Sequence, residues 1–467
     1  MSPHAPPGHS AEARPGESAT PEDFRRPRRT AAAFAAVVAV VATGVGLLDK
    51  HSELPVYLRA AGRFVAGEQF YRPDEPPAFT YPPFAVLPYR PLLSLPESAR
   101  GPAYAVVNGL LCGVTAWLIA GLALPVTSGL TVRTRRVCAV AIALLAGRFV
   151  LSPLEYQSND LFVVAFSVVG VAALSRGRSA GGGASLGLAA AFKATPLLFL
   201  PVLVWRRQLL AAAAFGVAMI AATGLPDLWS PADDGRPWAV TWYDAFVSKV
   251  EVGNAPEAAG AWTRWNGLNQ SLGGTIYRLG TPVEPNGIDV FDVAVVSLTP
   301  RTVKLVTLAA AACVLLAVAF ATFPRDERDL SPSERRFRRL AEAGVVFAAM
   351  LLLSPMSSKQ HFCVLAVPIT VAVVDVATRR RDPWVIAGLA VIGVCGSLGG
   401  KDLVGREFGN FLQACGTITF ATLVALATSA HVVSARQREQ IGAIGRPEID
   451  RADADPAGTG ENLRTAA

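Results

Sequence analysis

Several polar residues attract notice because they interrupt or border long apolar runs. Glu53 and the Tyr81-Pro-Pro-Phe84 stretch follow the first run, Lys193 lies inside another, and Asp160 and His361 each stand where a run begins. A carboxylate can accept the proton of an attacking hydroxyl. A cation can stabilise negative charge that develops during a reaction. These residue types provide both functions if the fold brings them together.

Each of these residues also has a structural interpretation. A glutamate just outside a helix is commonly an interfacial charge, and a lysine in an apolar run can extend its side chain to the headgroups. A histidine at the start of a helix can serve as a cap, and Asn159 is a plausible N-cap for a helix that begins at Asp160. The elements that carry these residues must therefore be placed first.

The composition is typical of a polytopic membrane protein. Of the 467 residues, 52% are hydrophobic and only 17% are charged, and the mean hydropathy is +0.38. The net charge of +7 comes from short basic clusters beside apolar runs, a positive-inside pattern that argues against nucleic-acid binding. The six cysteines all lie in apolar stretches without a Cys-x-x-Cys pair, which predicts neither a zinc site nor disulfides.

The apolar runs predict an all-α fold with about ten transmembrane helices. A crossing helix needs roughly 20 apolar residues, and only helices or closed barrels satisfy their backbone in lipid. The predicted crossings lie near residues 31–49, 103–124, 136–152, 159–175, 208–224, 304–323, 340–353, 361–378, 384–399 and 408–430.

One further apolar segment, residues 183–205, has basic residues at both ends. Arg178 precedes it and Arg206 follows it, so both ends belong on the same side of the membrane. Lys193 and the Thr195-Pro196 break predict two re-entrant half-helices of about ten residues, each rising roughly 15 Å, with Lys193 at mid-depth. The alternative is an ordinary crossing with a snorkelling lysine, which would invert the topology downstream.

The basic connectors assign the sides of the membrane. They place both termini in the cytoplasm and the long outer loops 50–102 and 225–303 on the extracytoplasmic face. Residues 1–30 and 431–467 are predicted as disordered cytoplasmic tails around one membrane domain, residues 31–430.

Five motifs, taken in order, resemble those of the bacterial polytopic transferases of glycosyltransferase family 87, which have the GT-C fold. The first combines Glu53 with Gly67-x-x-x-Tyr71 and the Tyr-Pro-Pro-Phe element. The others are Gln157-x-Asn159, Gly187 to Pro196 with its lysine, Asn269-Gln-Ser-Leu272, and Ser354-Pro followed by His361. The resemblance covers roughly residues 31 to 430, and all the polar motifs fall on the predicted outer side.

The resemblance implies a membrane hexosyltransferase that takes its sugar from a polyprenyl phosphate. The expected sugar is mannose, and the expected acceptor is a lipid-linked or glycan hydroxyl on the extracytoplasmic face of a bacterial plasma membrane. Transfer would invert the anomeric carbon and form an alpha-1,2 bond. A lipid-linked donor needs no nucleotide-diphosphate clamp such as an Asp-x-Asp metal site. No metal or other cofactor is therefore expected.

The resemblance also suggests roles for individual residues. Glu53 stands where the family usually has an aspartate and is the candidate general base, while Asp160 is its main rival. Lys193 and His361 are the candidates to stabilise the leaving phosphate. The remaining rival carboxylates are Glu68, Asp74 and Glu75, and the residues expected to bind substrate are Tyr57, Tyr81, Gln157, Asn159, Lys193, Asn269, Gln270 and His361.

Other interpretations stay open at this point. A transporter or a lipid or glycolipid flippase would also be polytopic and could use Lys193 and Asp160 as intramembrane charges. A related GT-C enzyme could use arabinose or glucose instead of mannose. Aromatic residues of the second outer loop can stack on a sugar or lie at the membrane interface; these are Trp238, Trp242, Tyr243, Trp262 and Trp265.

Overall fold

A computed structural model of the chain describes residues 21–48, 52–75, 77–250, 265–283, 291–325, 327–379, 381–398 and 401–444. These residues form helices and connecting loops, with no β-strand among them. The bundle contains α1 (Pro21–Gly46), α4 (Glu97–Ala123), α5 (Val132–Glu155), α6 (Asp160–Leu174), α7 (Ser179–Phe192), α8 (Phe199–Trp205), α9 (Leu209–Trp229), α12 (Pro300–Ala321), α13 (Pro332–Leu353), α14 (Ala366–Thr378), α15 (Pro383–Leu398) and α18 (Thr417–Ile444).

Within the described residues, six helical segments are long and apolar enough to cross a membrane. They correspond to α4, α5, α9, α12, α18 and the segment Lys359–Thr378 that contains α14. Shorter apolar helices lie at Ala31–Gly46, Asp160–Leu174, Thr195–Trp205 and Pro383–Leu398. The predicted all-α polytopic membrane fold is confirmed.

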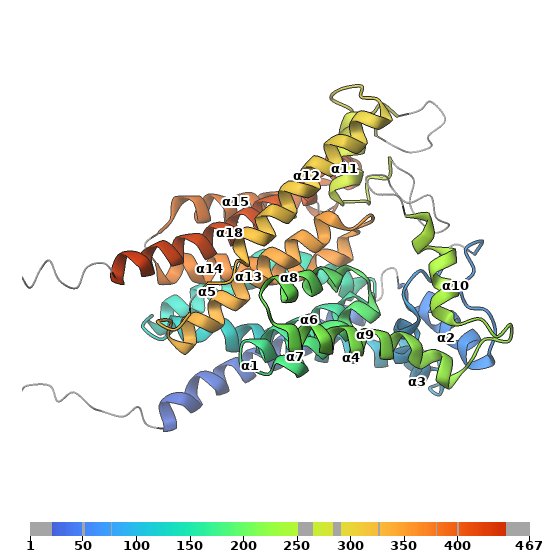
Figure 1. Cartoon of the computed structure of the whole chain (residues 1–467), viewed down its shortest axis with the longest axis horizontal. Helices are drawn as coiled ribbons and strands as arrows, with labels where there is room; N and C mark the ends of the chain where they lie inside the picture. The colour runs from blue at the N-terminus through green and yellow to red at the C-terminus, as the bar shows by residue number, and fades with distance from the viewer. Residues whose placement is uncertain are drawn as a thin grey trace, which may run out of the picture.

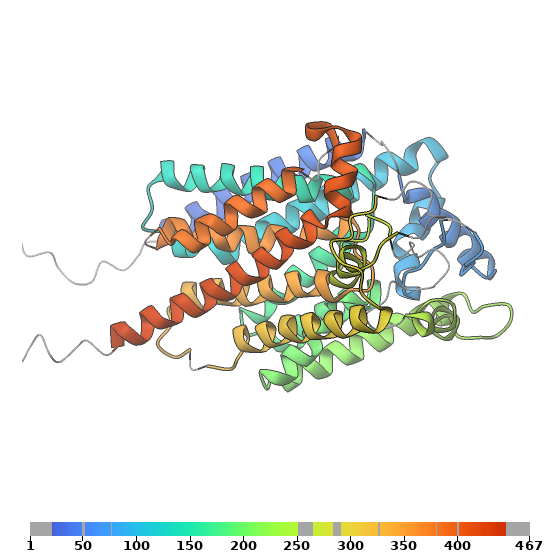
Figure 2. The ribbon, with the colours of Figure 1, turned by 90° about the horizontal axis from the view of Figure 1, so that it is seen from above.

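The bundle has two different ends. Helix α1 begins and α18 ends at one of them, which we call the tail end (Figures 1 and 2). Short helices gather at the opposite end, which we call the cap end; there α2, α3 and α10 lie beyond the long helices (Figure 1). The shorter elements are α2 (Leu54–Ala66), η1 (Pro83–Tyr89), α3 (Arg90–Leu93), α10 (Trp238–Ala245), α11 (Leu272–Gly280), α16 (Lys401–Val404) and α17 (Arg406–Ala414).

The segment from α7 to α9 enters and returns at the same end, as the flanking arginines predict. Helices α7 and α9 run parallel, because Gly183 faces Ala211 and Gly187 faces Phe215. A Cβ atom at these glycines would lie 2.0 Å and 2.3 Å from the carbonyl oxygens of the facing residues, so only glycine permits this approach. The chain between α7 and α9 must therefore return to its starting end, through the 3₁₀ turn η3 (Thr195–Leu198) and α8.

Lys193 lies at the level where the neighbouring helix α6 begins. It stands where α7 ends, in extended conformation, and its side chain reaches Asp160 at the start of the antiparallel helix α6. The 14 residues of α7 rise roughly 21 Å, more than the half-helix that was expected. Lys193 is thus carried to the level at which α6 begins, on the cap side.

Helix extends into both predicted tails. Helix α1 begins at Pro21 and α18 continues to Ile444, while residues 1–20 and 445–467 lie outside the described residues. Ion pairs hold the end of α18 to the bundle: Arg436 lies 2.6 Å from Asp375, and Arg379 lies 2.7 Å from Glu439. These ion pairs connect the last turns of α18 to the end of α14.

The cap has an aromatic core of its own. The indole of Trp238 is fully buried, packs on Phe70 and donates a hydrogen bond to the Ser230 carbonyl at 2.8 Å. Trp242 likewise donates to the Thr80 carbonyl at 2.9 Å. These two tryptophans hold α10 on the first outer loop, whereas Trp262 lies outside the described residues.

Candidate active site

Glu53 lies at the junction of three chain segments on the cap side of the bundle. It directly precedes α2, and its backbone N–H donates to the Tyr156 carbonyl at 2.8 Å. Its carboxylate accepts the Tyr57 hydroxyl at 2.5 Å on Oε2 and the Gln360 amide at 3.1 Å on Oε1. The carboxylate is therefore held in one place by donors from the first outer loop and from the segment before α14.

The surroundings make Glu53 a stronger proton acceptor than an ordinary glutamate. Burial raises the pKa of its carboxyl group, and the hydrogen bond from Tyr57 opposes this effect only in part. The negative charge of Asp160 raises the pKa further, while Lys193 lowers it. A partly buried carboxylate with a raised pKa is the kind of group that general-base catalysis uses.

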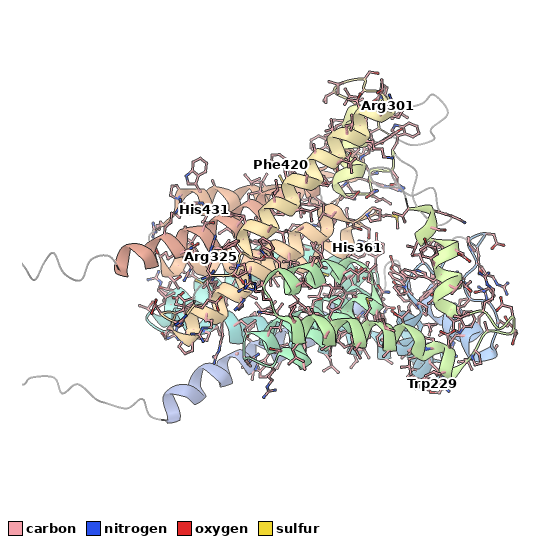
Figure 3. The ribbon with its side chains drawn as sticks, viewed as in Figure 1. Trp229, Arg301, Arg325, His361, Phe420 and His431 are labelled. Carbon is pink, nitrogen blue, oxygen red and sulfur yellow. The ribbon has the colours of Figure 1, made fainter. Side chains whose placement is uncertain are left out.

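Asp160 is engaged in a different set of contacts. The Lys193 ammonium lies 2.6 Å from its Oδ1, and the Ser158 hydroxyl donates to Oδ2 at 3.1 Å. His361 approaches the same Oδ1 with Nε2 at 4.0 Å, and Figure 3 places this histidine toward the cap end. The structure thus joins a carboxylate, an ammonium and an imidazole from three separate segments.

Two predicted tyrosines surround the charged groups. The ring of Tyr57 lies edge-on to that of Tyr81, with 5.8 Å between centroids, and the Lys193 ammonium lies 5.5 Å from the centroid of the Tyr81 ring. Burial raises the pKa of both phenols well above the ordinary value, so both stay neutral. They can donate hydrogen bonds and provide an apolar wall.

The two amides of the Gln157-x-Asn159 motif differ: that of Gln157 is hydrogen-bonded to the protein, whereas that of Asn159 is not. The Gln157 side chain accepts from Ser52 at 2.8 Å and donates to the Gly46 carbonyl at 3.0 Å, which ties the end of α1 to the site. Asn159 is fully buried, yet neither atom of its amide has a hydrogen-bond partner. Its side chain does not cap α6.

Asn269 and Gln270 hold loops together and make no contact with the charged group. Asn269 donates to the Pro355 carbonyl at 3.2 Å and accepts the Ser357 N–H at 3.2 Å. The Gln270 amide donates to the Gln413 carbonyl at 2.7 Å. Asn269 therefore positions the Ser354-to-His361 segment, whereas the Gln270 side chain binds the end of α17 and only its backbone N–H reaches that segment, at the Ser357 carbonyl.

The three minor rival carboxylates face elsewhere. Glu75 forms ion pairs with Arg59 at 2.9 Å and Arg63 at 2.6 Å, and the hydrogen bond from Arg63 holds its pKa below the ordinary value. Glu68 and Asp74 are exposed. None of the three makes a hydrogen bond or ion pair with the group around Glu53.

Gln360 is a site residue that the sequence analysis did not single out. Its amide nitrogen donates to Glu53, while its Oε1 is buried without a partner. Its place beside His361, at the start of an apolar run, is the signal that could have identified it. Among the described residues, no group of three or more His, Cys, Asp or Glu side chains could hold a metal ion.

The comparison with known families extends over most of this site. A model of glycosyltransferase family 87 matches residues 79–355, which include Tyr81, Asp160 and Lys193, while Glu53 and His361 lie outside the match. No curated protein matches the chain. Since the match spans more than half of the sequence, the chain belongs to glycosyltransferase family 87 and is a multi-pass membrane glycosyltransferase.

Proposed function

We propose that this glycosyltransferase transfers a hexose, with mannose as the first candidate, from a polyprenyl phosphate to a hydroxyl of a lipid-linked or glycan acceptor. The reaction would take place on the extracytoplasmic face of a bacterial plasma membrane, with inversion at the anomeric carbon. The observation that carries the proposal is that the Glu53 carboxylate lies near enough to the Lys193–Asp160 ion pair for both charges to act on its pKa.

Glu53 is the proposed general base. The acceptor oxygen forms a bond to the anomeric carbon and its proton passes to Glu53, while the bond from that carbon to the phosphate oxygen breaks. The leaving polyprenyl phosphate keeps the electron pair of this bond. The raised pKa of Glu53 supports proton acceptance, because a base is most effective when its pKa approaches the working pH.

Lys193 is the proposed partner of the leaving phosphate. Its side chain is 12% exposed and its nitrogen is held by a single carboxylate oxygen, so further N–H protons remain for phosphate oxygens. Asp160 then acts as a positioning residue. Because the Lys193 ammonium already compensates its negative charge, it is less suited to receive a proton than Glu53, whose donors are neutral.

His361 is assigned a neutral ring; its Nε2 is 4.0 Å from Asp160, too far for a hydrogen bond between them. Its Nδ1 accepts the backbone N–H of Ser358 at 3.2 Å, so in the neutral ring the proton lies on Nε2, the atom nearest to Asp160. This assignment differs from the expectation of a second cation facing phosphate. Asn159, with an unpartnered buried amide beside Asp160, is the candidate to bind sugar hydroxyls.

Purified protein incubated with radiolabelled polyprenyl-phosphate mannose and a membrane glycolipid extract tests the proposal. We expect labelled glycan in the unmodified protein and loss of product in Glu53→Gln. Parallel donors that carry arabinose and glucose identify the sugar. In sealed vesicles, movement of label across the membrane without a new glycosidic bond would instead support the flippase alternative.

A further inference from the structure

A second polar cluster lies at the tail end, far from the candidate active site along the bundle. Two carboxylates form its centre. Glu342 on α13 binds Arg206 and lies 3.1 Å from Arg338, while Glu327 lies 3.2 Å from Arg206 and 2.9 Å from Arg339. The cluster joins the end of α8 to the α12–α13 connection.

Several arginine N–H groups of this cluster have no partner. The Nε of Arg206 and the Nη2 of Arg338 are buried without a hydrogen bond, and these side chains are only 7% and 9% exposed. Nη1 of Arg325 and Nε of Arg335 are also buried and unpartnered. An unmet buried donor on a charged group is costly, so these groups indicate a ligand with several acceptor oxygens.

The charges of the cluster do not balance among the described residues. Five arginines, at positions 206, 325, 335, 338 and 339, lie beside two carboxylates, Glu327 and Glu342. Burial and the nearby charges of Arg338 and Arg206 lower the pKa of Arg325, and Glu342 opposes this effect only in part. Like charges confined in a poorly solvated site repel each other, and a bound anion would relieve this repulsion.

The position of the cluster matches the headgroup level of a bilayer. Trp205 and Phe323, the neighbours of this cluster in the chain, are 47% and 49% exposed, and their rings meet edge to face at 5.8 Å. Exposed aromatic residues at the ends of apolar helices are typical of the membrane interface. Figure 3 places Arg325 toward the tail end of the bundle, away from His361.

We propose that the tail-end cluster binds a phosphate group, supplied by an anionic lipid headgroup or by the free anion. The unpartnered N–H groups of Arg206, Arg325, Arg335 and Arg338 would donate to the phosphate oxygens. Because Arg206 ends the re-entrant segment that carries Lys193, the ligand joins this segment to the α12–α13 connection. Ligand binding at this site would therefore stabilise the tail end of the re-entrant segment that carries Lys193.

Thermal unfolding of the detergent-purified full chain tests the site. The probes are short-chain phosphatidylglycerol, phosphatidylcholine with the same acyl chains, and inorganic phosphate. Arg325→Gln is the main variant, because the hydrogen-bond and cation–π contacts of Arg325 among the described residues are confined to Phe320: a 3.5 Å hydrogen bond to its carbonyl and a cation–π contact with its ring at 5.5 Å. Arg335→Gln is the second variant, and Arg381→Gln is the matched control because Arg381 is exposed and has no ion pair among the described residues.

We expect phosphatidylglycerol to raise the melting temperature saturably, and Arg325→Gln and Arg335→Gln each to weaken its affinity about tenfold. Arg381→Gln should stay within about twofold of the unmodified protein. An equal, arginine-dependent shift with inorganic phosphate would show that the site takes the free anion. The proposal fails if neither anion gives a saturable shift, if phosphatidylcholine stabilises equally, or if Arg381→Gln loses as much affinity as the other variants.

Discussion

Replacing Glu53 with glutamine removes the proposed base while keeping the size of the side chain. The new amide oxygen can still accept the Tyr57 hydroxyl, and the new NH₂ group would face Gln360. The Oε1 of Gln360 is buried without a partner, so a half-turn of its amide supplies the acceptor that this NH₂ group needs. We therefore expect the variant to fold.

The size of the effect follows from the separation of roles at the site. General-base catalysis contributes about 10²- to 10⁴-fold to a rate, which corresponds to about 2.7 to 5.4 kcal/mol of the activation barrier. Lys193 and Asp160 stay in place, so donor binding should change little. Loss of charge from two hydrogen bonds should change the free energy of unfolding by only about 1 to 2 kcal/mol.

Initial rates at saturating donor measure the prediction, with donor affinity and melting temperature as controls. Glu53→Asp should keep part of the activity, because it retains the carboxylate while shortening the side chain by one methylene. A Glu53→Gln enzyme that turns over within a few-fold of the unmodified protein would refute the assignment and move it to Asp160. The pH dependence of the rate gives a further check. Because burial raises the pKa of Glu53, activity should begin to fall at a higher pH than it would if the base were an unperturbed glutamate.

Three more outcomes are expected. Tyr57→Phe removes a hydrogen bond that lowers the pKa of Glu53, so the acid limb of kcat/KM should move to higher pH; an unchanged limb would contradict this. Lys193→Ala should lower kcat/KM for the phosphate-linked donor by about 10²-fold, and Lys193→Arg should retain part of the activity. Normal kinetics in Lys193→Ala would show that the lysine only anchors its segment in the membrane. In intact cells, an impermeant maleimide should label a cysteine at exposed Asp234 but none at exposed Arg381, and the reverse would invert the topology.

Much of the fold was predictable because its signals are local. Apolar runs locate the helices, and the arginines around residues 183–205 predict the re-entrant path that the parallel packing of α7 on α9 confirms. The position of Lys193 along the bundle was not predictable, since it depends on how far α7 continues. Glycines at 183 and 187 let α7 pack directly on the α9 backbone, and the sequence alone does not show that contact.

The candidate site was predictable where residue chemistry is distinctive. Charged groups are scarce in apolar surroundings, so Glu53, Asp160 and Lys193 were conspicuous, and the structure brings them together. Amides are ambiguous, because the same side chain can bind a sugar or satisfy the backbone; Gln270 does the latter. Gln360 was missed because its contact with Glu53 joins segments 307 residues apart.

The two carboxylates of the site have different hydrogen-bond and ion-pair partners, and this difference supports the roles that we propose for them. Glu53 is held by neutral donors, Tyr57 and Gln360, which orient the carboxylate without supplying a full positive charge. Asp160 is held by an ammonium, so its negative charge is already compensated. We therefore propose that a proton released by an acceptor hydroxyl passes to Glu53, while Asp160 directs Lys193 toward the place where phosphate charge would develop.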